Sequence, residues 1–118
     1  LCVIAEELGR VLAPLPVSSS IYLAAEFINA AGTEAQKAAW LPRLASGEAI
    51  GTFAFAEGVG RVTPRSIQTA AAGGTLNGSK APVADGDIAD VAVVAARTGT
   101  GSDERSISLF LVDLNGPG

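Results

Sequence analysis

The chain has 118 residues, of which 48% are hydrophobic and 17% are charged. This length fits one ordinary domain, and the apolar content argues against intrinsic disorder. Twelve acidic residues outnumber eight basic ones, which gives a formal net charge of -4, and the basic residues are scattered singly along the chain. Nucleic acid is therefore not expected as a partner.

The residue types that the sequence lacks narrow the possible chemistry. Histidine is absent and Cys2 is the only cysteine, so we expect neither a Ser-His-Asp triad nor a metal site built on histidines or several cysteines. No apolar run approaches the roughly 18 residues that span a membrane, and no leader opens the sequence. We therefore expect a cytoplasmic protein with no membrane span. Because the sequence opens without methionine and with helical spacing, we also expect a fragment of a longer protein.

Apolar spacing predicts two helices at the start of the chain. The first covers residues 1–13, where apolar side chains recur at helical spacing until Pro14 ends the pattern. The second begins at one of the three serines at 18–20 and runs to Ala31. It is apolar nearly all round, so we expect it to be buried.

A third helix has its own start and stop signals. Thr33 and Gln36 form a capping box, and Gly47 is a typical stop. Pro42 lies inside this helix and cannot donate a backbone hydrogen bond, so we expect a kink or early fraying there.

Beyond Gly47 the apolar pattern alternates, as it does in β-strands. The predicted strands cover residues 50–56, 65–72, 91–96 and 107–114. Asn77-Gly78 predicts the turn of a hairpin, because both residues tolerate positive φ. Three helices followed by a run of strands predict an α+β fold.

Two glycine-rich stretches invite a nucleotide-binding interpretation that the sequence does not support. Gly58-Val59-Gly60 starts like a dinucleotide-binding fingerprint, but Thr63 stands at the third glycine position and Pro64 follows it, so we reject a Rossmann site. Residues 73–80 have the glycine spacing of a phosphate loop but end in Gly-Ser-Lys. A turn explains these glycines better.

Several side chains near the first strand allow both a structural and a functional interpretation. Glu57 closes the strand, where a carboxylate is either catalytic or, as we favour, a hydrogen-bonding group of the strand end. Phe53 and Phe55 point to one face and suit either core packing or a cofactor platform. Lys80 and Arg61 are interpreted as solvated charges.

Four blocks of the sequence, in the same order, resemble acyl-CoA dehydrogenases. Residues 32–37 and 40–48 resemble the helix that closes the N-terminal domain of that family. Residues 50–57 resemble its first flavin-contacting strand, which usually ends in Thr-Glu or Ser-Glu before a glycine-rich loop. Residues 76–80 are similar to its hairpin and residues 89–98 to the following strand, so the resemblance covers nearly the whole chain.

The resemblance implies an FAD enzyme that removes two hydrogens from an acyl-CoA thioester and passes the electrons to an electron-transfer flavoprotein. Residues 1–48 would be the C-terminal part of an N-terminal helical domain, and residues 49–118 the first part of a central, partial antiparallel β domain. The family's catalytic base is a glutamate in a C-terminal helical domain, so this chain alone is expected to contain no catalytic residue and to be inactive. A homo- or hetero-oligomer is also implied.

By motif position, eight residues would hold the flavin. They are Phe53, Phe55 and Ala56 along the isoalloxazine ring, Gly60 and Arg61 near the pyrophosphate, and Pro82, Val83 and Ala84 on the far side of the ring. Strand ends present backbone amides to a flavin edge, and a glycine loop lets the chain approach a phosphate closely.

Three positions depart from the family pattern. Ala56 stands where the family usually has a hydroxyl, Arg61-Val62 where it has Ser-Asp, and residues 82–84 where it often has Trp-Ile-Thr or Trp-Ile-Ser. Arg61 would offset part of this loss by pairing with a phosphate. The eroded motif leaves two alternatives: a non-catalytic subunit of a heteromeric acyl-CoA dehydrogenase, or a stand-alone β module that binds a small apolar ligand.

Overall fold

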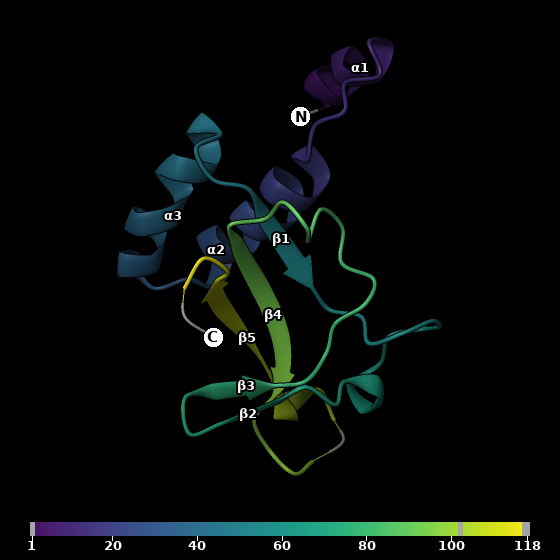
Figure 1. Ribbon diagram of the computed structural model, residues 1–118, viewed down its shortest axis with the longest axis vertical. Helices are drawn as coiled ribbons and strands as arrows, with labels where there is room; N and C mark the ends of the chain where they lie inside the picture. Colours follow the sequence, from purple (N-terminus) through teal and green to yellow (C-terminus); the bar gives the residue numbers. More distant parts are fainter. Residues whose placement is uncertain (1, 102, 117–118) are drawn as a thin grey trace.

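The computed structural model describes residues 2–101 and 103–116. Helices cover one face of a five-stranded sheet, and α1 projects from this body at one end (Figure 1). In chain order the elements are α1 (Cys2–Arg10), η1 (Ser18–Ala25), α2 (Glu26–Ala31), α3 (Glu34–Ser46), β1 (Gly51–Ala54), η2 (Pro64–Ser66), β2 (Ala70–Ala72), β3 (Thr75–Asn77), β4 (Val91–Arg97), η3 (Glu104–Ser106) and β5 (Ile107–Asp113).

The first two predicted helices are confirmed with small shifts in their bounds. α1 ends at Arg10, shortly before the predicted end. η1 and α2 follow each other without a break, as predicted, but η1 is a π-helix. The hydroxyl of Ser20 on η1 accepts a hydrogen bond from the backbone N–H of Gly51 at 3.0 Å, which joins this helix to β1.

The third helix, α3, begins with the predicted capping box. Thr33 Oγ1 accepts from the Gln36 backbone at 3.2 Å, and Gln36 Oε1 accepts from the Thr33 backbone at 2.8 Å. Gly47 has a φ of 75°, the left-handed conformation that commonly ends a helix. The helix runs through Pro42, so the predicted early fraying does not occur. Leu44, which is 2% exposed, anchors the last turn in the core.

β4 is the central strand of the sheet. It pairs in parallel with β1 and antiparallel with β5, and it meets β2 at Ala70 and Arg97. The prediction of an antiparallel β domain is therefore wrong for the β1–β4 pair, and the sheet is mixed. Parallel neighbours require a long crossover connection, and residues 55–90 provide it.

The β2–β3 hairpin turns at Gly73-Gly74, so the turn predicted at Asn77-Gly78 is wrong. Ala72 pairs with Thr75, and the two intervening glycines have φ values of 58° and 80°. A two-residue hairpin turn of this kind requires positive φ at both positions. Two glycines meet this requirement more easily than Asn-Gly, because neither has a Cβ.

Only the last three residues of the predicted strand 65–72, Ala70–Ala72, are β structure. Pro64–Ser66 instead form the 3-10 helix η2. Thr63 Oγ1 accepts from the Ser66 backbone at 3.3 Å, and Ser66 Oγ accepts from the Thr63 backbone at 2.9 Å. Such local side-chain bonds compete with strand pairing, which explains the shorter strand.

The core lies between the helices and the sheet. Its buried members are Ala24, Ile28, Leu44, Ala49, Val91 and Val93. β1 approaches the helices so closely that a Cβ added to Gly51 would lie 2.6 Å from the Ala24 Cβ and 3.2 Å from Leu44 Cδ2. The absence of a side chain at Gly51 therefore sets the distance between helices and sheet.

We predict that Gly51→Ala lowers the free energy of unfolding by about 1–3 kcal/mol, the usual cost of forcing an extra methyl group into a packed core. Gly9→Ala in α1 is the control, because a Cβ at Gly9 meets no atom within 4 Å. Denaturant unfolding followed by circular dichroism measures both variants against the wild type. Wild-type stability in Gly51→Ala would contradict the packing argument.

Candidate functional site

The crossover between β1 and β4 folds back so that two predicted flavin segments lie side by side. The first segment is residues 53–56 and the second is residues 82–84. The backbone N–H of Ala81 donates to the Ala56 carbonyl at 2.9 Å, and that of Gly58 donates to the Ala81 carbonyl at 2.6 Å. These bonds form an isolated parallel bridge between Glu57 and Ala81. Ala56 and Pro82 are therefore brought close to each other just beyond β1.

A buried hydroxyl fixes the far end of the second segment. Thr52 on β1 is 1% exposed, and its Oγ1 donates to the Ala84 carbonyl at 2.6 Å. Val83, which is half-buried, lines a hollow together with Ala54 of β1 and Val94 of β4. Since side chains alternate along a strand, this hollow lies on the sheet face opposite the helices. The predicted residues 82–84 are thereby held along β1.

The two phenylalanines after Thr52 stack on each other. The ring centroids of Phe53 and Phe55 are 5.4 Å apart with an interplanar angle of 15°, and Phe27 of α2 lies 4.4 Å from Phe53 on the helical side. Phe53 packs against the core cluster, whereas Phe55 remains 37% exposed. Phe53 therefore packs in the core, whereas part of the Phe55 ring remains accessible to a ligand.

The glycine loop after Glu57 is open. Gly58 and Gly60 have φ values of 112° and 123°, and a Cβ at either would meet no atom within 4 Å. Gly60 and Arg61 are both exposed. These two predicted residues lie outside the paired segments, on a loop whose backbone and guanidinium group face solvent.

Glu57 and Lys80 form an ion pair at the junction of the two segments. Lys80 Nζ lies 2.6 Å from Glu57 Oε1, and the two side chains are only 9% and 10% exposed. Glu57 also accepts the backbone N–H groups of Gln68 and Thr69 at 2.6 and 2.9 Å. The structural interpretation of Glu57 is confirmed. The interpretation of Lys80 as a solvated charge is wrong, because it is buried and paired.

This environment decides the protonation state of Glu57. Burial by itself would raise the pKa of Glu57, but the hydrogen bonds from Lys80, Thr69 and Gln68 outweigh burial and lower the pKa to about 2. The carboxylate is therefore ionised at neutral pH and is a weak proton acceptor. Glu57 suits a structural role better than that of a general base.

A hydrogen bond also joins the helices to the end of the second segment, residues 82–84. Ser19 of η1 is 1% exposed, and its hydroxyl donates to Asp85 Oδ2 at 2.5 Å. Asp85 follows the predicted residue Ala84 directly and has a φ of 54°. Sequence reasoning missed this contact, because no local pattern relates a serine to an aspartate 66 positions away.

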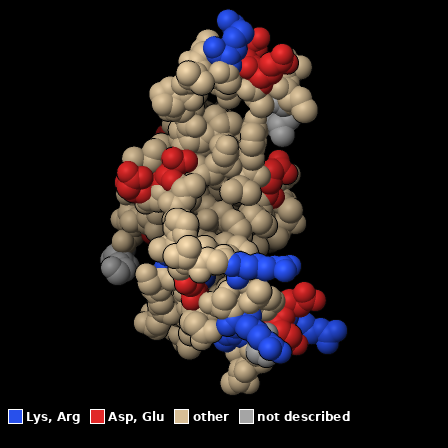
Figure 2. Space-filling model, turned by 90° about the vertical axis from the view of Figure 1, so that its right-hand side faces the viewer, with Lys and Arg blue, Asp and Glu red and all other residues tan. Residues whose placement is uncertain are grey.

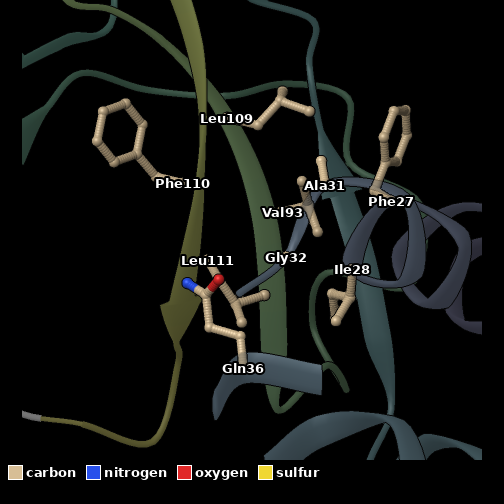
Figure 3. A pocket seen from close by; sticks show the side chains of 9 residues that line it. All are labelled: Phe27, Ile28, Ala31, Gly32, Gln36, Val93, Leu109, Phe110 and Leu111. Atoms are coloured by element: carbon tan, nitrogen blue, oxygen red, sulfur yellow. The ribbon is translucent and has the colours of Figure 1, made fainter. Parts of the chain in front are cut away.

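A small cavity of about 70 Å³ lies elsewhere, on the helical side of β4 and β5 (Figure 3). Its lining residues are Phe27, Ile28, Ala31, Gly32, Gln36, Val93, Leu109, Phe110 and Leu111. Gln36 is also the capping residue of α3, whereas the other lining side chains are apolar. Since its lining contains none of the eight predicted flavin residues, this cavity is separate from the candidate site.

On the face shown in Figure 2, basic and acidic side chains lie together near the top and in the lower part, and acidic ones alone are spread across the middle, so charge does not single out a site there. Within residues 2–101 and 103–116, no three His, Cys, Asp or Glu side chains are grouped so that they could hold a metal ion. In the same described part of the chain, no helix has the length and apolar character that crossing a membrane requires. The backbone junction beyond β1 therefore remains the candidate site.

Known proteins resemble this chain in sequence. The family model described as "Acyl-CoA dehydrogenase, N-terminal domain" matches residues 1–48. The acyl-CoA dehydrogenase of Bacillus subtilis (strain 168) is 33% identical over 118 residues, which cover 95% of this chain and 31% of that protein. The human mitochondrial very long-chain specific acyl-CoA dehydrogenase is 38% identical over 93 residues, which cover 70% of this chain and 14% of that protein.

A solved structure agrees with these matches. The glutaryl-CoA dehydrogenase from Mycobacterium smegmatis in complex with FADH2 has a TM-score of 0.73 and 40% sequence identity, over 86% of this chain and 26% of that chain. The chain belongs to the acyl-CoA dehydrogenase family, and the predicted family is confirmed. It spans between 14% and 31% of the length of the relatives named here.

We predict that acid destabilises the fold partly through Glu57. Its pKa is 4.5 without these contacts and about 2 in the folded chain. A lowered folded pKa contributes stability above pH 4.5, and this contribution is lost as the pH falls from about 4.5 to about 2. Urea unfolding at several pH values in this window should show a shallower loss of stability in Glu57→Gln than in the wild type.

Glu34→Gln is the matched control, because Glu34 pairs with Lys37 at 3.0 Å but its side chain is 92% exposed. Exposed ion pairs contribute little, so this variant should keep the wild-type pH dependence. An identical pH dependence in Glu57→Gln and the wild type would refute the role of Glu57 in acid stability.

Proposed function

We propose that this chain supplies one wall of the flavin site of an FAD-linked acyl-CoA dehydrogenase. The observation that carries the proposal is the pairing of Ala56 with Ala81, which brings the two predicted flavin segments together beside the stacked Phe53 and Phe55. Family membership supports FAD as the cofactor, since the Mycobacterium smegmatis relative was solved with FADH2.

The residues at this junction fit the successive parts of FAD. The exposed face of Phe55 suits offset stacking against an isoalloxazine ring. The open bend at Gly60 lets a phosphate approach the backbone, and the exposed Arg61 suits paired phosphate oxygens. Residues 82–84 would close the far side of the ring. FAD, when bound, supplies the hydride acceptor, whereas this chain binds and orients the cofactor.

The proton acceptor of the reaction is proposed to lie outside this junction. Two carboxylates lie beside the candidate site. The oxygens of Glu57 accept from Lys80 and two backbone amides, and Asp85 Oδ2 accepts from Ser19. A base must reach the proton that it removes, and a fully engaged carboxylate of low pKa is unsuited to that role. The base would therefore come from another segment of the catalytic protein.

The resemblance supplies the remaining parts of the proposal. The substrate would be an acyl-CoA thioester, the electron acceptor an electron-transfer flavoprotein, and the working protein a cytoplasmic homo- or hetero-oligomer. The division into a helical part, residues 1–48, and a β part, residues 49–118, is supported by the match of the N-terminal domain model to residues 1–48.

A second candidate function is that of a non-catalytic subunit in a heteromeric acyl-CoA dehydrogenase. Ala56 favours it, because an alanine offers the flavin no hydroxyl at that position. The stand-alone β module is disfavoured, since Gly51 of β1 packs directly against Ala24 of η1 and Leu44 of α3. The sheet therefore shares its core with the helices instead of closing on itself.

We predict that the 118-residue chain alone has no acyl-CoA dehydrogenase activity, even with added FAD and a chemical electron acceptor. Loss of a positioned base costs about 10²- to 10⁴-fold in rate, and lost substrate positioning adds to this cost. Enoyl-CoA formation is measured across several acyl chain lengths, in parallel with the full gene product. Turnover by the chain that disappears in Glu57→Gln would contradict the proposed division of roles.

The full gene product tests the proposed function directly. Bound FAD, seen as flavin absorbance after gel filtration, together with enoyl-CoA formation supports the enzyme. Bound FAD without turnover supports the non-catalytic subunit. A full gene product that neither retains nor binds added FAD would refute a flavin site at the junction.

We also predict that Ala56→Thr in the full gene product strengthens FAD binding by about 0.5–1.5 kcal/mol, the net value of one added hydrogen bond. Titration of flavin fluorescence measures the change. Ala72→Thr is the control, because Ala72 is an exposed strand position outside the candidate site. Unchanged affinity in a correctly folded Ala56→Thr would mean that position 56 does not face the flavin.

A further inference from the structure

The Glu57–Lys80 ion pair has no assigned part in cofactor binding so far. Removing two charges from water costs free energy, which a buried pair recovers only when its remaining donors and acceptors are also bonded. Several of these groups are bonded: Lys80 Nζ also donates to the Phe55 carbonyl at 3.3 Å, and Glu57 also accepts the backbone amides of Gln68 and Thr69. The pair is the centre of a hydrogen-bond network.

The carboxylate side of this network closes the glycine loop. Its Oε2 accepts from the Gln68 backbone at 2.6 Å and its Oε1 from the Thr69 backbone at 2.9 Å. Glu57 directly precedes Gly58, where the loop that carries Gly60 and Arg61 begins, and its carboxylate binds the backbone at Gln68 and Thr69, where the loop returns.

The ammonium side joins the other two segments. Lys80 immediately precedes Ala81, which pairs with Ala56, and residues 82–84 follow directly. Through its bond to the Phe55 carbonyl, Lys80 also reaches the residue whose ring is exposed beside the junction. The buried pair thus connects the three parts of the chain with predicted flavin contacts, which are Phe55, the glycine loop and residues 82–84.

Stability alone does not account for charges at this position. Apolar side chains of similar volume often stabilise a fold as well as a buried ion pair does. What charged hydrogen bonds add is direction and a defined separation between the groups that they join. That property matters where three segments must face one ligand, because a misplacement of about 1 Å is enough to impair function.

We infer that Glu57 and Lys80 are positioning residues, whose ion pair holds the glycine loop and residues 82–84 at the separation at which both contact one FAD molecule. This inference rests on the proposed function. Both side chains act from within the protein, through the backbone groups that they bind, and neither touches the cofactor.

The test compares charge-removing and charge-conserving variants in the full gene product. Lys80→Met removes the charge and keeps the chain length, whereas Lys80→Arg keeps a donor to Glu57. Lys37→Met is the matched control, because Lys37 forms a comparable 3.0 Å pair with the exposed Glu34. FAD affinity, the flavin absorption spectrum, amide exchange of residues 58–69 and the melting temperature are measured for each.

We expect Lys80→Met to fold, to weaken FAD binding by about tenfold or more, to shift the flavin spectrum and to speed amide exchange at Gln68 and Thr69. Lys80→Arg should restore most of the affinity, and Lys37→Met should match the wild type. If Lys80→Met does not fold, Glu57→Gln, which keeps the size of the side chain, decides by the same measurements.

Two failures are distinguishable. A wild-type protein that binds no FAD would refute the proposed function and the inference with it. A wild type that binds FAD, beside a folded Lys80→Met with wild-type affinity and spectrum, would refute the positioning role alone, even if amide exchange in the loop becomes faster.

Discussion

The parallel pairing of β1 with β4 is the constraint on which the rest of the structure depends. Parallel neighbours cannot be joined by a tight turn, so the chain must cross over before it returns. That crossover, residues 55–90, carries every predicted flavin residue except Phe53. β4 is fixed in turn by β5 on its other side and by the helices above Val91 and Val93. The site is therefore built on the connection that the sheet requires.

Polar contacts, more than burial, hold this crossover in place. Of residues 55–90, only Ile67 and Thr69 are buried as whole residues, although the side chains of Glu57 and Lys80 are only 10% and 9% exposed. The guanidinium group of Arg97 at the end of β4 donates to the carbonyls of Ile67 at 2.9 Å and Pro64 at 2.5 Å. Apolar contacts are non-directional, whereas hydrogen bonds fix an orientation. The crossover can thus keep a defined position although few of its residues are buried, and its outer face remains exposed to solvent.

Sequence reasoning recovered the features that have local signals. The capping box of α3, the apolar alternation at β1 and the apolar stretches of β4 and β5 are local signals, and these elements formed where they were predicted. The hairpin failed because Gly73-Gly74 competed with Asn77-Gly78, and strand register, a tertiary property, decided between them. Lys80 was misjudged because its partner, Glu57, lies 23 positions away. Within the candidate site, the residues that the family motif assigns to flavin binding stay a prediction, and the hydrogen bonds that join their segments could not be read from spacing.

Two of the departures from the family pattern, Ala56 and Ala84, fall at positions where the backbone and not the side chain forms the hydrogen bonds of the junction. The Ala56 carbonyl accepts from Ala81, and the Ala84 carbonyl accepts from Thr52. Neither bond depends on the side chain at position 56 or 84, so alanine there leaves the junction intact. Glu57, by contrast, acts through its side chain, and its carboxylate is fully engaged. The residue types at positions 56 and 84 can therefore vary without breaking these backbone bonds, and under the proposed function they would adjust cofactor affinity.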